Sequence, residues 1–311
     1  MNVLLTGANG FLGKFLVGYL PKRQDIRLFP VYRSKAQLNQ AFGPSVHPLL
    51  VEQAFEEYAW ETELRNIDVV IHAAGKAHVA AGENDLPEFR RVNVDAALNL
   101  ARRAARAGVK RFVFISSIGV NGNGSDIAYT EQATPNPSGA YAISKYEAEL
   151  ALLKLAETSP MEIVIIRPPL IYGPDAPGNF AQLVRAVKKG VPLPFGMINN
   201  RRTLVGIDNL ASLIHVCLSH PGAANQIFLA ADAETVSTTE LLRTMAEGLG
   251  KKSRLVPVPL AMLRAAAGVA GKKDVIDKIC GDLAVDIGKA RRLLGWHPPL
   301  SFREAMLKSL R

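Results

Sequence analysis

Two side chains that could move a proton stand four residues apart near the middle of the chain. Tyr141 and Lys145 occupy positions i and i+4 of a predicted helix over 140–157, so both lie on one helix face. A lysine cation there lowers the pKa of the phenol from its ordinary ~10, which lets the tyrosine exchange a proton near neutral pH. The same spacing also occurs in ordinary surface pairs, so a third group must decide between the two interpretations.

Ser117 is that third group. It follows a predicted strand over 111–116 and should face the crevice at the carboxyl edge of the sheet. Its hydroxyl could hydrogen-bond a substrate oxygen beside the tyrosine, whereas strand alternation turns the neighbouring Ser116 to the opposite face. Together the three residues predict proton transfer coupled to hydride transfer.

The glycine-rich segment 6–13 (TGANGFLG) predicts where a dinucleotide would bind. It joins a predicted strand over 3–6 to a predicted helix over 11–20, as a βαβ dinucleotide site requires. Gly7 permits the tight turn, Gly10 lets the backbone approach a pyrophosphate over the helix N-terminus, and Gly13 allows close helix–sheet packing. In this context a plain tight turn is the weaker interpretation.

The residues about 20 positions after this turn bear on which dinucleotide binds, because an acidic residue there would hold the adenosine ribose hydroxyls. The segment 31–35 (VYRSK) contains no carboxylate. The Arg33 guanidinium, with Ser34 beside it, could instead pair with a 2′-phosphate. NADP(H) is therefore favoured over NAD(H). NAD(H) stays open, because Arg33 could also be a solvated residue at a helix start.

These groups need a scaffold, and short β-branched runs that alternate with helical patterns are typical of βαβ units and a parallel sheet. We expect a Rossmann-like, doubly wound parallel α/β sheet with a smaller, mostly helical substrate-binding lobe. The predicted strands cover 3–6, 27–32, 46–50, 68–73, 111–116, 162–167, 203–207 and 225–229, and the longer predicted helices cover 11–20, 87–107, 140–157 and 180–189.

Prolines and glycines after residue 167 indicate where the chain leaves this sheet. We expect residues 1–168 and 203–230 to form the dinucleotide-binding domain, and residues 169–202 and 231–311 to form the second lobe. The Gly/Asn- and Pro-rich segment 117–138 predicts a loop, and 237–240 (STTE) fits a capping box at a helix start.

Composition excludes several classes of protein. A charged content of 21% argues against general disorder, and an apolar content of 48% is enough for a large core. The net charge of +9 is spread in short pairs without interleaved aromatic residues, so we expect no nucleic-acid partner but an attraction for anionic small molecules. Lys188-Lys189 and Lys272-Lys273 are interpreted as solvated faces.

Cysteines and histidines are scattered, so we expect no metal site and a reducing compartment. The longest apolar stretch, near 260–270, is interrupted by Arg264 and is too short for the ~20 residues of a membrane span. The chain starts directly on a predicted strand. We therefore expect a cytoplasmic protein with no membrane partner.

In this order the motifs resemble the extended short-chain dehydrogenase/reductase family, which contains the NAD-dependent epimerases and dehydratases. The matching segments run over essentially the whole chain: VVIHAAG at 69–75, Asn93-Val94, FVFISS at 112–117, YAISK at 141–145, RPPLIYGP at 167–174 and RRTLVGIDNL at 201–210. The Asp-Glu pair that family dehydratases carry after the serine is replaced by Ile118-Gly119, which argues against dehydration.

The resemblance implies that Tyr141 is the acid/base, that Lys145 activates it and anchors a ribose, and that Ser117 is the oxyanion partner. Asn93 would be a cofactor-side or proton-relay residue. The cofactor residues that the motifs and the resemblance together indicate are Gly7, Asn9, Gly10, Phe11, Leu12, Gly13, Arg33, Ser34, Ala73, Ala74, Gly75, Tyr141, Lys145, Pro168 and Leu170.

The second-lobe segments resemble a nucleotide-sugar site. The resemblance implies that Asn179 and Phe180 contact the nucleotide and that Leu193 and Phe195 lie beside it. Arg202 would grip the diphosphate, which a guanidinium can hold through two parallel hydrogen bonds. The alternative is that Arg201 and Arg202 form an exposed turn.

Within the family the chain resembles bacterial reductases and 4-epimerases of surface-polysaccharide pathways. This implies reduction of a UDP-4-keto-6-deoxy-N-acetylhexosamine, with hydride delivered to C4 while Tyr141 protonates O4. The alternatives are a UDP-hexose 4-epimerase with tightly bound NAD, and a catalytically silent dinucleotide sensor or assembly factor. By analogy, a homodimer would form through the helices over 87–107 and 140–157.

Overall fold

The computed structural model describes residues 1–23, 25–38, 42–77, 85–271 and 273–310. Its main feature is a parallel sheet of seven strands in the order β10-β7-β5-β4-β1-β2-β3, which confirms the predicted fold class. The order reverses between β1 and β4, and in such sheets ligands bind at the carboxyl edge beside that point. The strands are β1 Asn2–Thr6, β2 Arg27–Tyr32, β3 Leu49–Leu50, β4 Val69–His72, β5 Arg111–Ile115, β7 Glu162–Arg167 and β10 Gln226–Leu229.

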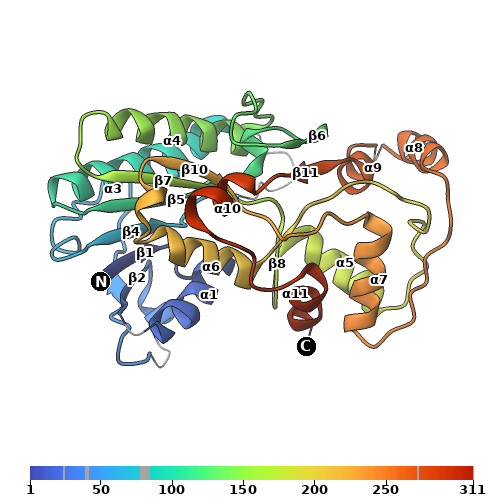
Figure 1. Cartoon of the computed structure of the whole chain (residues 1–311), viewed down its shortest axis with the longest axis horizontal. Helices are drawn as coiled ribbons and strands as arrows, with labels where there is room; N and C mark the ends of the chain where they lie inside the picture. Colours follow the sequence, from blue (N-terminus) through green and yellow to red (C-terminus); the bar gives the residue numbers. More distant parts are fainter. Residues whose placement is uncertain (24, 39–41, 78–84, 272, 311) are drawn as a thin grey trace.

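Helices cover both faces of this sheet (Figure 1). Side chains alternate along β1, so Val3 and Leu5 join the core under α1 (Phe11–Tyr19) and α6 (Ile207–Cys217), whereas Leu4 faces the opposite core. That second core is closed by α3 (Ala96–Arg106) and α4 (Ala140–Ala156). Because both faces of the sheet are buried, β4 and β5 consist almost wholly of apolar residues.

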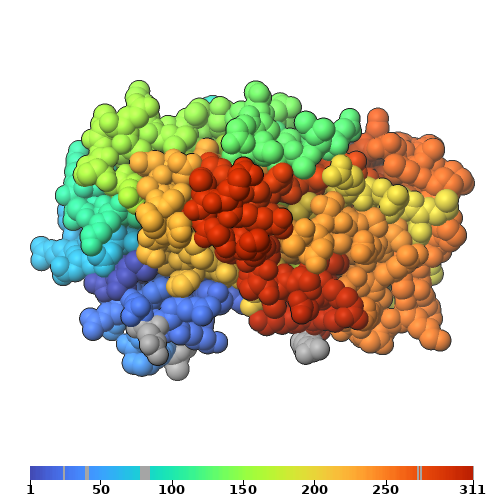
Figure 2. Space-filling model, in the orientation of Figure 1, coloured from blue at the N-terminus to red at the C-terminus, as the bar shows by residue number. Residues whose placement is uncertain are grey.

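The second lobe is mostly helical and has its own apolar core, which contains Phe180, Phe195 and Met245. Its C-terminal segment crosses the junction with the sheet in the view of Figure 2. The helices are α5 Gly178–Lys188, α7 Thr238–Gly248, α8 Leu260–Val269, α9 Lys273–Cys280 and α11 Phe302–Ser309, with α10 Gly288–Leu294 at the junction. Two parallel strand pairs accompany them, β8 Ile171–Tyr172 with β9 Val205–Gly206, and β6 Ser125–Tyr129 with β11 Leu283–Val285.

Four elements differ from the sequence predictions. The helix predicted over 87–107 consists of α2 (Leu86–Arg90), a π-helical turn (Arg91–Asp95) and α3, and such a turn leaves no trace in hydrophobic periodicity. The predicted loop over 117–138 contains β6, whose partner β11 lies far away in sequence. The strand predicted over 203–207 is only β9, which pairs with β8 outside the main sheet. Finally, Ser237 caps α7 without a reciprocal bond, and the full capping box is formed by Ser301 and Glu304.

Candidate active site

The glycine-rich turn between β1 and α1 forms one wall of a cleft at the carboxyl edge of the sheet. Gly7 has a φ of +74°, and a Cβ on it would lie 2.6 Å from the carbonyl carbon of Ala73. A Cβ on Gly13 would overlap the carbonyl oxygen of Gly7, so α1 packs this closely only with glycine there. The N-cap of α1 is Gly10, and no described side chain caps its first amides, which suits an anionic group.

The cleft beside this turn has a volume of about 470 Å³. Because its floor is glycine and alanine backbone, the diphosphate of a dinucleotide could approach the amides of α1 closely. The residues present therefore fit a dinucleotide. Six of the predicted cofactor residues line the cleft, namely Gly7, Gly10, Arg33, Ala73, Ala74 and Gly75.

Two arginines at this cleft are in different electrostatic situations. Arg91 is ion-paired with Glu88 at 2.8 Å and also with Glu56. Arg33 is exposed, and among the described residues its guanidinium has no carboxylate partner, although its backbone amide donates to Gln37. Arg33 is thus free to bind an anion in the cleft, but the Glu56 carboxylate lines the same space.

The remaining predicted cofactor residues have mixed surroundings. Asn9 is exposed at the turn, Phe11 and Ser34 are half-buried, and Leu12 belongs to the core under the sheet. The carbonyl of Pro168 accepts a hydrogen bond from the Ile118 amide at 2.9 Å, which ties the segment after β7 to the one after β5.

Helix α4 brings Tyr141 and Lys145 to the same edge of the sheet. The Tyr141 phenol lies beside Ser117, which follows β5, so the structure brings together the serine and tyrosine predicted from the sequence. The Lys145 ammonium donates to the Ile115 carbonyl at 2.8 Å and lies 4.5 Å from the centre of the Phe114 ring. A Cβ on Gly75 would lie 3.3 Å from Lys145 Nζ, so this cation borders the dinucleotide cleft.

The pKa values of these groups differ from the sequence-based expectation. Burial raises the pKa of Tyr141, the nearby Ser117 hydroxyl counteracts this effect, and Lys145 is not a cause of the shift. Burial lowers the pKa of Lys145 to about 8, with the Glu149 carboxylate acting in the opposite direction. The lysine therefore carries a buried, titratable charge beside the phenol instead of simply lowering the pKa of the phenol.

Asn93 is buried in the π-helical turn and positions its neighbours. Its amide group receives a hydrogen bond from the Lys76 amide at 2.8 Å and donates to the Lys76 carbonyl at 3.0 Å and to Ser144 at 2.9 Å. Ser144 in turn donates to the Tyr141 carbonyl. Asn93 thus ties the segment after β4 to α4.

A buried ion pair beneath the site was not anticipated from the sequence. Arg167 and Glu149 are 3% and 1% exposed and lie 2.5 Å apart. Glu149 also accepts a hydrogen bond from Ser116, and Arg167 donates to Asn121. Glu149 lies eight residues after Tyr141 on the same helix, and this spacing is the sequence signal that could have pointed to it.

The second lobe contributes a separate cavity of about 380 Å³ near the carboxyl edge of the sheet. Its walls include Leu170, Asn179 and Arg202 from the predicted ligand residues, together with Thr238 and Lys278. Arg202 donates to the backbone carbonyls of Lys278 and Gly281, and burial lowers its pKa. It is therefore held in the cavity wall and not in an exposed turn.

Three other predicted substrate residues do not line this cavity. Phe180 is 2% exposed and packs on Tyr172, and Phe195 is 7% exposed in the same core. Leu193 forms a backbone bridge with Leu255. These side chains support the lobe.

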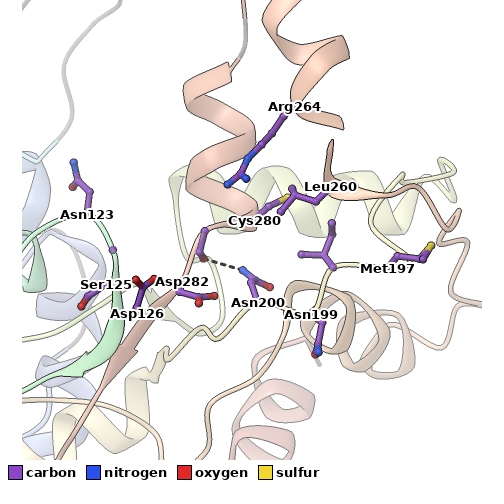
Figure 3. A pocket seen from close by; sticks show the side chains of 13 residues that line it. Asn123, Ser125, Asp126, Met197, Asn199, Asn200, Leu260, Arg264, Cys280 and Asp282 are labelled. Atoms are coloured by element: carbon purple, nitrogen blue, oxygen red, sulfur yellow. Dashed lines mark hydrogen bonds between the residues drawn. The ribbon is translucent and has the colours of Figure 1, made fainter. Parts of the chain in front are cut away.

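A third cleft, about 690 Å³ and strongly polar, lies between β6 and the second lobe (Figure 3). Asp126 and Asp282 lie next to each other at one side of it, and Asn200 donates to the Gly281 carbonyl at 2.9 Å. No residue predicted from the sequence lines it. Within the part of the chain that the structure describes, no cluster of His, Cys, Asp and Glu could hold a metal ion, and no helix is long and apolar enough to cross a membrane.

The fold and the site define a dinucleotide-binding α/β enzyme with a serine, a tyrosine and a lysine at the edge of the cofactor cleft. The model of the NAD dependent epimerase/dehydratase family matches residues 3–231. The chain belongs to this family, which confirms the resemblance found in its motifs.

Known relatives agree with this assignment. The UDP-glucose 4-epimerase of Vibrio cholerae is 41% identical over 308 residues, which cover 97% of this chain and 92% of that protein. The N-acetyl-alpha-D-glucosaminyl-diphospho-ditrans,octacis-undecaprenol 4-epimerase of Escherichia coli O157:H7 is 26% identical, over 90% of this chain and 81% of that protein. The structure of UDP-glucuronic acid 4-epimerase from Bacillus cereus, in complex with UDP-glucuronic acid and NAD, superposes with a TM-score of 0.80 at 20% identity. The match covers 100% of this chain and 98% of that one and shows a shared fold.

Proposed function

We propose that this protein is a 4-epimerase of a UDP-hexose that works with NAD. The observation that carries the proposal is the placement of Ser117 next to Tyr141, with the buried Lys145 ammonium on the same helix at the border of the glycine-walled cleft. The 41% identity with a UDP-glucose 4-epimerase supports this substrate class over the reduction of a 4-keto sugar.

The roles of the side chains follow from their positions. Bound NAD would supply a hydride acceptor and donor at the cleft. Tyr141 would take the proton of the sugar O4 hydroxyl and return it after the sugar presents its other face, while the Ser117 hydroxyl holds the same oxygen. Lys145, whose ammonium borders the cleft, would contact the cofactor ribose.

The substrate would lie with its diphosphate near Arg202 and its nucleotide near Asn179, because both line the second-lobe cavity. A guanidinium fixed by two backbone carbonyls keeps further N–H groups for a phosphate.

We also expect a homodimer through α2, α3 and α4, which would cover Leu150, 50% exposed on α4. Light scattering would test it.

A second candidate is NADPH-dependent 4-reduction of a UDP-4-keto-6-deoxy-N-acetylhexosamine, in surface-polysaccharide synthesis. It is favoured by Arg33, which lines the cofactor cleft without a carboxylate partner among the described residues. A reductase must exchange its cofactor at each turnover, whereas an epimerase regenerates it.

The two candidates are separated by denaturing the purified protein and identifying the released nucleotide, and by incubating it with UDP-glucose and UDP-N-acetylglucosamine. Retained NAD and conversion to the 4-epimer without added cofactor are expected. An empty site, no 4-epimer, and NADPH oxidation that depends on the 4-keto sugar would replace the epimerase with the reductase.

A further inference from the structure

Two segments of the second lobe carry basic residues without any acidic ones. Segments 178–202 and 249–273 contain eleven lysines and arginines and no aspartate or glutamate, although the whole chain carries a net charge of only +9. The basic residues are Arg185, Lys188, Lys189, Arg201, Arg202, Lys251, Lys252, Arg254, Arg264, Lys272 and Lys273, of which Lys272 lies outside the described residues.

The fold brings these two segments together. Leu193 bridges to Leu255, the Gly196 amide donates to the Val256 carbonyl at 2.9 Å, and Arg254 donates to the Gly190 carbonyl. Short pairs that look dispersed in the sequence thus form one basic surface. Helix α8, which belongs to the second segment, lies at the end of the molecule opposite the N-terminus (Figure 1).

Helix α8 is apolar on its outer side as well as its inner side. Leu263 and Ala267 are buried, but Met262 is 62% exposed and Val269 is 94% exposed. Its one charged residue, Arg264, is paired with Asp277. An ordinary surface helix presents polar residues to water, so this outer side indicates a partner with an apolar phase.

We propose that this distal face, made of Lys188, Lys189, Lys251, Lys252, Arg254, Val256, Met262 and Val269, docks on an anionic phospholipid bilayer. Exposed apolar side chains and lysines and arginines at one end of a protein fit a bilayer, where the former enter the headgroup boundary and the latter meet anionic lipids. This contact is peripheral, so it is compatible with a chain whose described helices cannot span a membrane.

Two other occupants fit less well. A single-stranded nucleic acid would be bound through stacking on aromatic rings, but the only aromatic residues of the two segments, Phe180 and Phe195, are buried; duplex DNA is an outcome of the test. A second copy of the same face would bring like charges together.

The test is co-sedimentation of the full chain with vesicles of phosphatidylcholine alone and with about 30% phosphatidylglycerol. The wild type is expected to bind only the anionic vesicles, and to be released at about 0.5 M salt because surface charges are then screened. Lys251→Glu, Lys252→Glu and Arg254→Glu together should lower the partition coefficient at least about tenfold. Met262→Asp with Val269→Asp should lower it similarly, since it places charge in the inserted face.

Matched controls separate this surface from net charge and from general stickiness. Lys14→Glu, Lys22→Glu and Arg291→Glu remove the same charge from exposed sites elsewhere, and Ile127→Asp changes an apolar side chain that is 76% exposed on β6. These controls should bind like the wild type, and a thermal melt verifies that each variant is folded.

Three results would overturn the proposal. The control variants could lose as much vesicle binding as the distal-face variants, the wild type could bind neutral vesicles equally well, or it could bind no vesicles at all. Binding of duplex DNA that survives both aspartate substitutions would overturn it as well.

Discussion

Replacing Lys145 by methionine tests the claim that a charged group is buried beside Tyr141. Lys145 is 4% exposed, and burial lowers its pKa from an ordinary 10.5 to about 8. At ~1.4 kcal/mol for each tenfold step, the protonated lysine costs the folded state roughly 3 kcal/mol at neutral pH. Methionine keeps most of the apolar stem without that charge.

The cost depends on pH in a defined direction. The unfolded chain holds the lysine proton up to about 10.5, whereas the folded chain releases it near 8, so raising the pH through this window stabilises the folded wild type. Relative to Lys145→Met, the wild type should therefore gain roughly 3 kcal/mol of unfolding free energy between about pH 7 and about pH 11.

Urea unfolding of both proteins across this range measures the difference. Lys154→Met, on the exposed side of the same helix, is the control and should show no such trend. If the difference in unfolding free energy between wild type and Lys145→Met does not change with pH, the argument is refuted. Other interactions in the fold would then offset the whole cost of burying the ammonium.

Other substitutions test neighbouring parts of the site. Gly13→Ala should abolish retention of the dinucleotide, measured as nucleotide released on denaturation, because a Cβ there overlaps the Gly7 carbonyl; a variant that retains it would disprove the close-packing argument. Arg33→Asp should shift the ratio of NADP to NAD affinity toward NAD, measured by fluorescence titration, and an unchanged ratio would show that Arg33 does not contact the ribose. Glu149→Gln should lower the unfolding free energy by about 3–5 kcal/mol, since it leaves Arg167 buried without its anion. A loss below about 1 kcal/mol would mean that water reaches the pair.

Much of the fold could be predicted because its signals are local. The glycine spacing at 7, 10 and 13 reflects close approaches within one turn, and β2 runs over 27–32 as its apolar pattern indicated. Tyr141 and Lys145 share a helix face for the same local reason.

The missed features depend on contacts between distant segments. β6 pairs with β11 more than a hundred residues later, and no turn signal near 125 indicates it. The Glu149–Arg167 pair joins α4 to β7, so neither residue stands out alone. The basic surface of the second lobe exists only because residues 190–196 pack against 254–256.

The central claim is that the Tyr141 phenol transfers the proton at the sugar O4, and Tyr141→Phe tests it most directly. The variant keeps the ring and its T-shaped contact with Phe89 but has no proton to exchange. We expect it to retain the dinucleotide at wild-type stoichiometry while its rate of C4 epimerisation of the UDP-hexose falls about 10²–10⁴-fold. An unchanged rate with the cofactor in place would contradict the account.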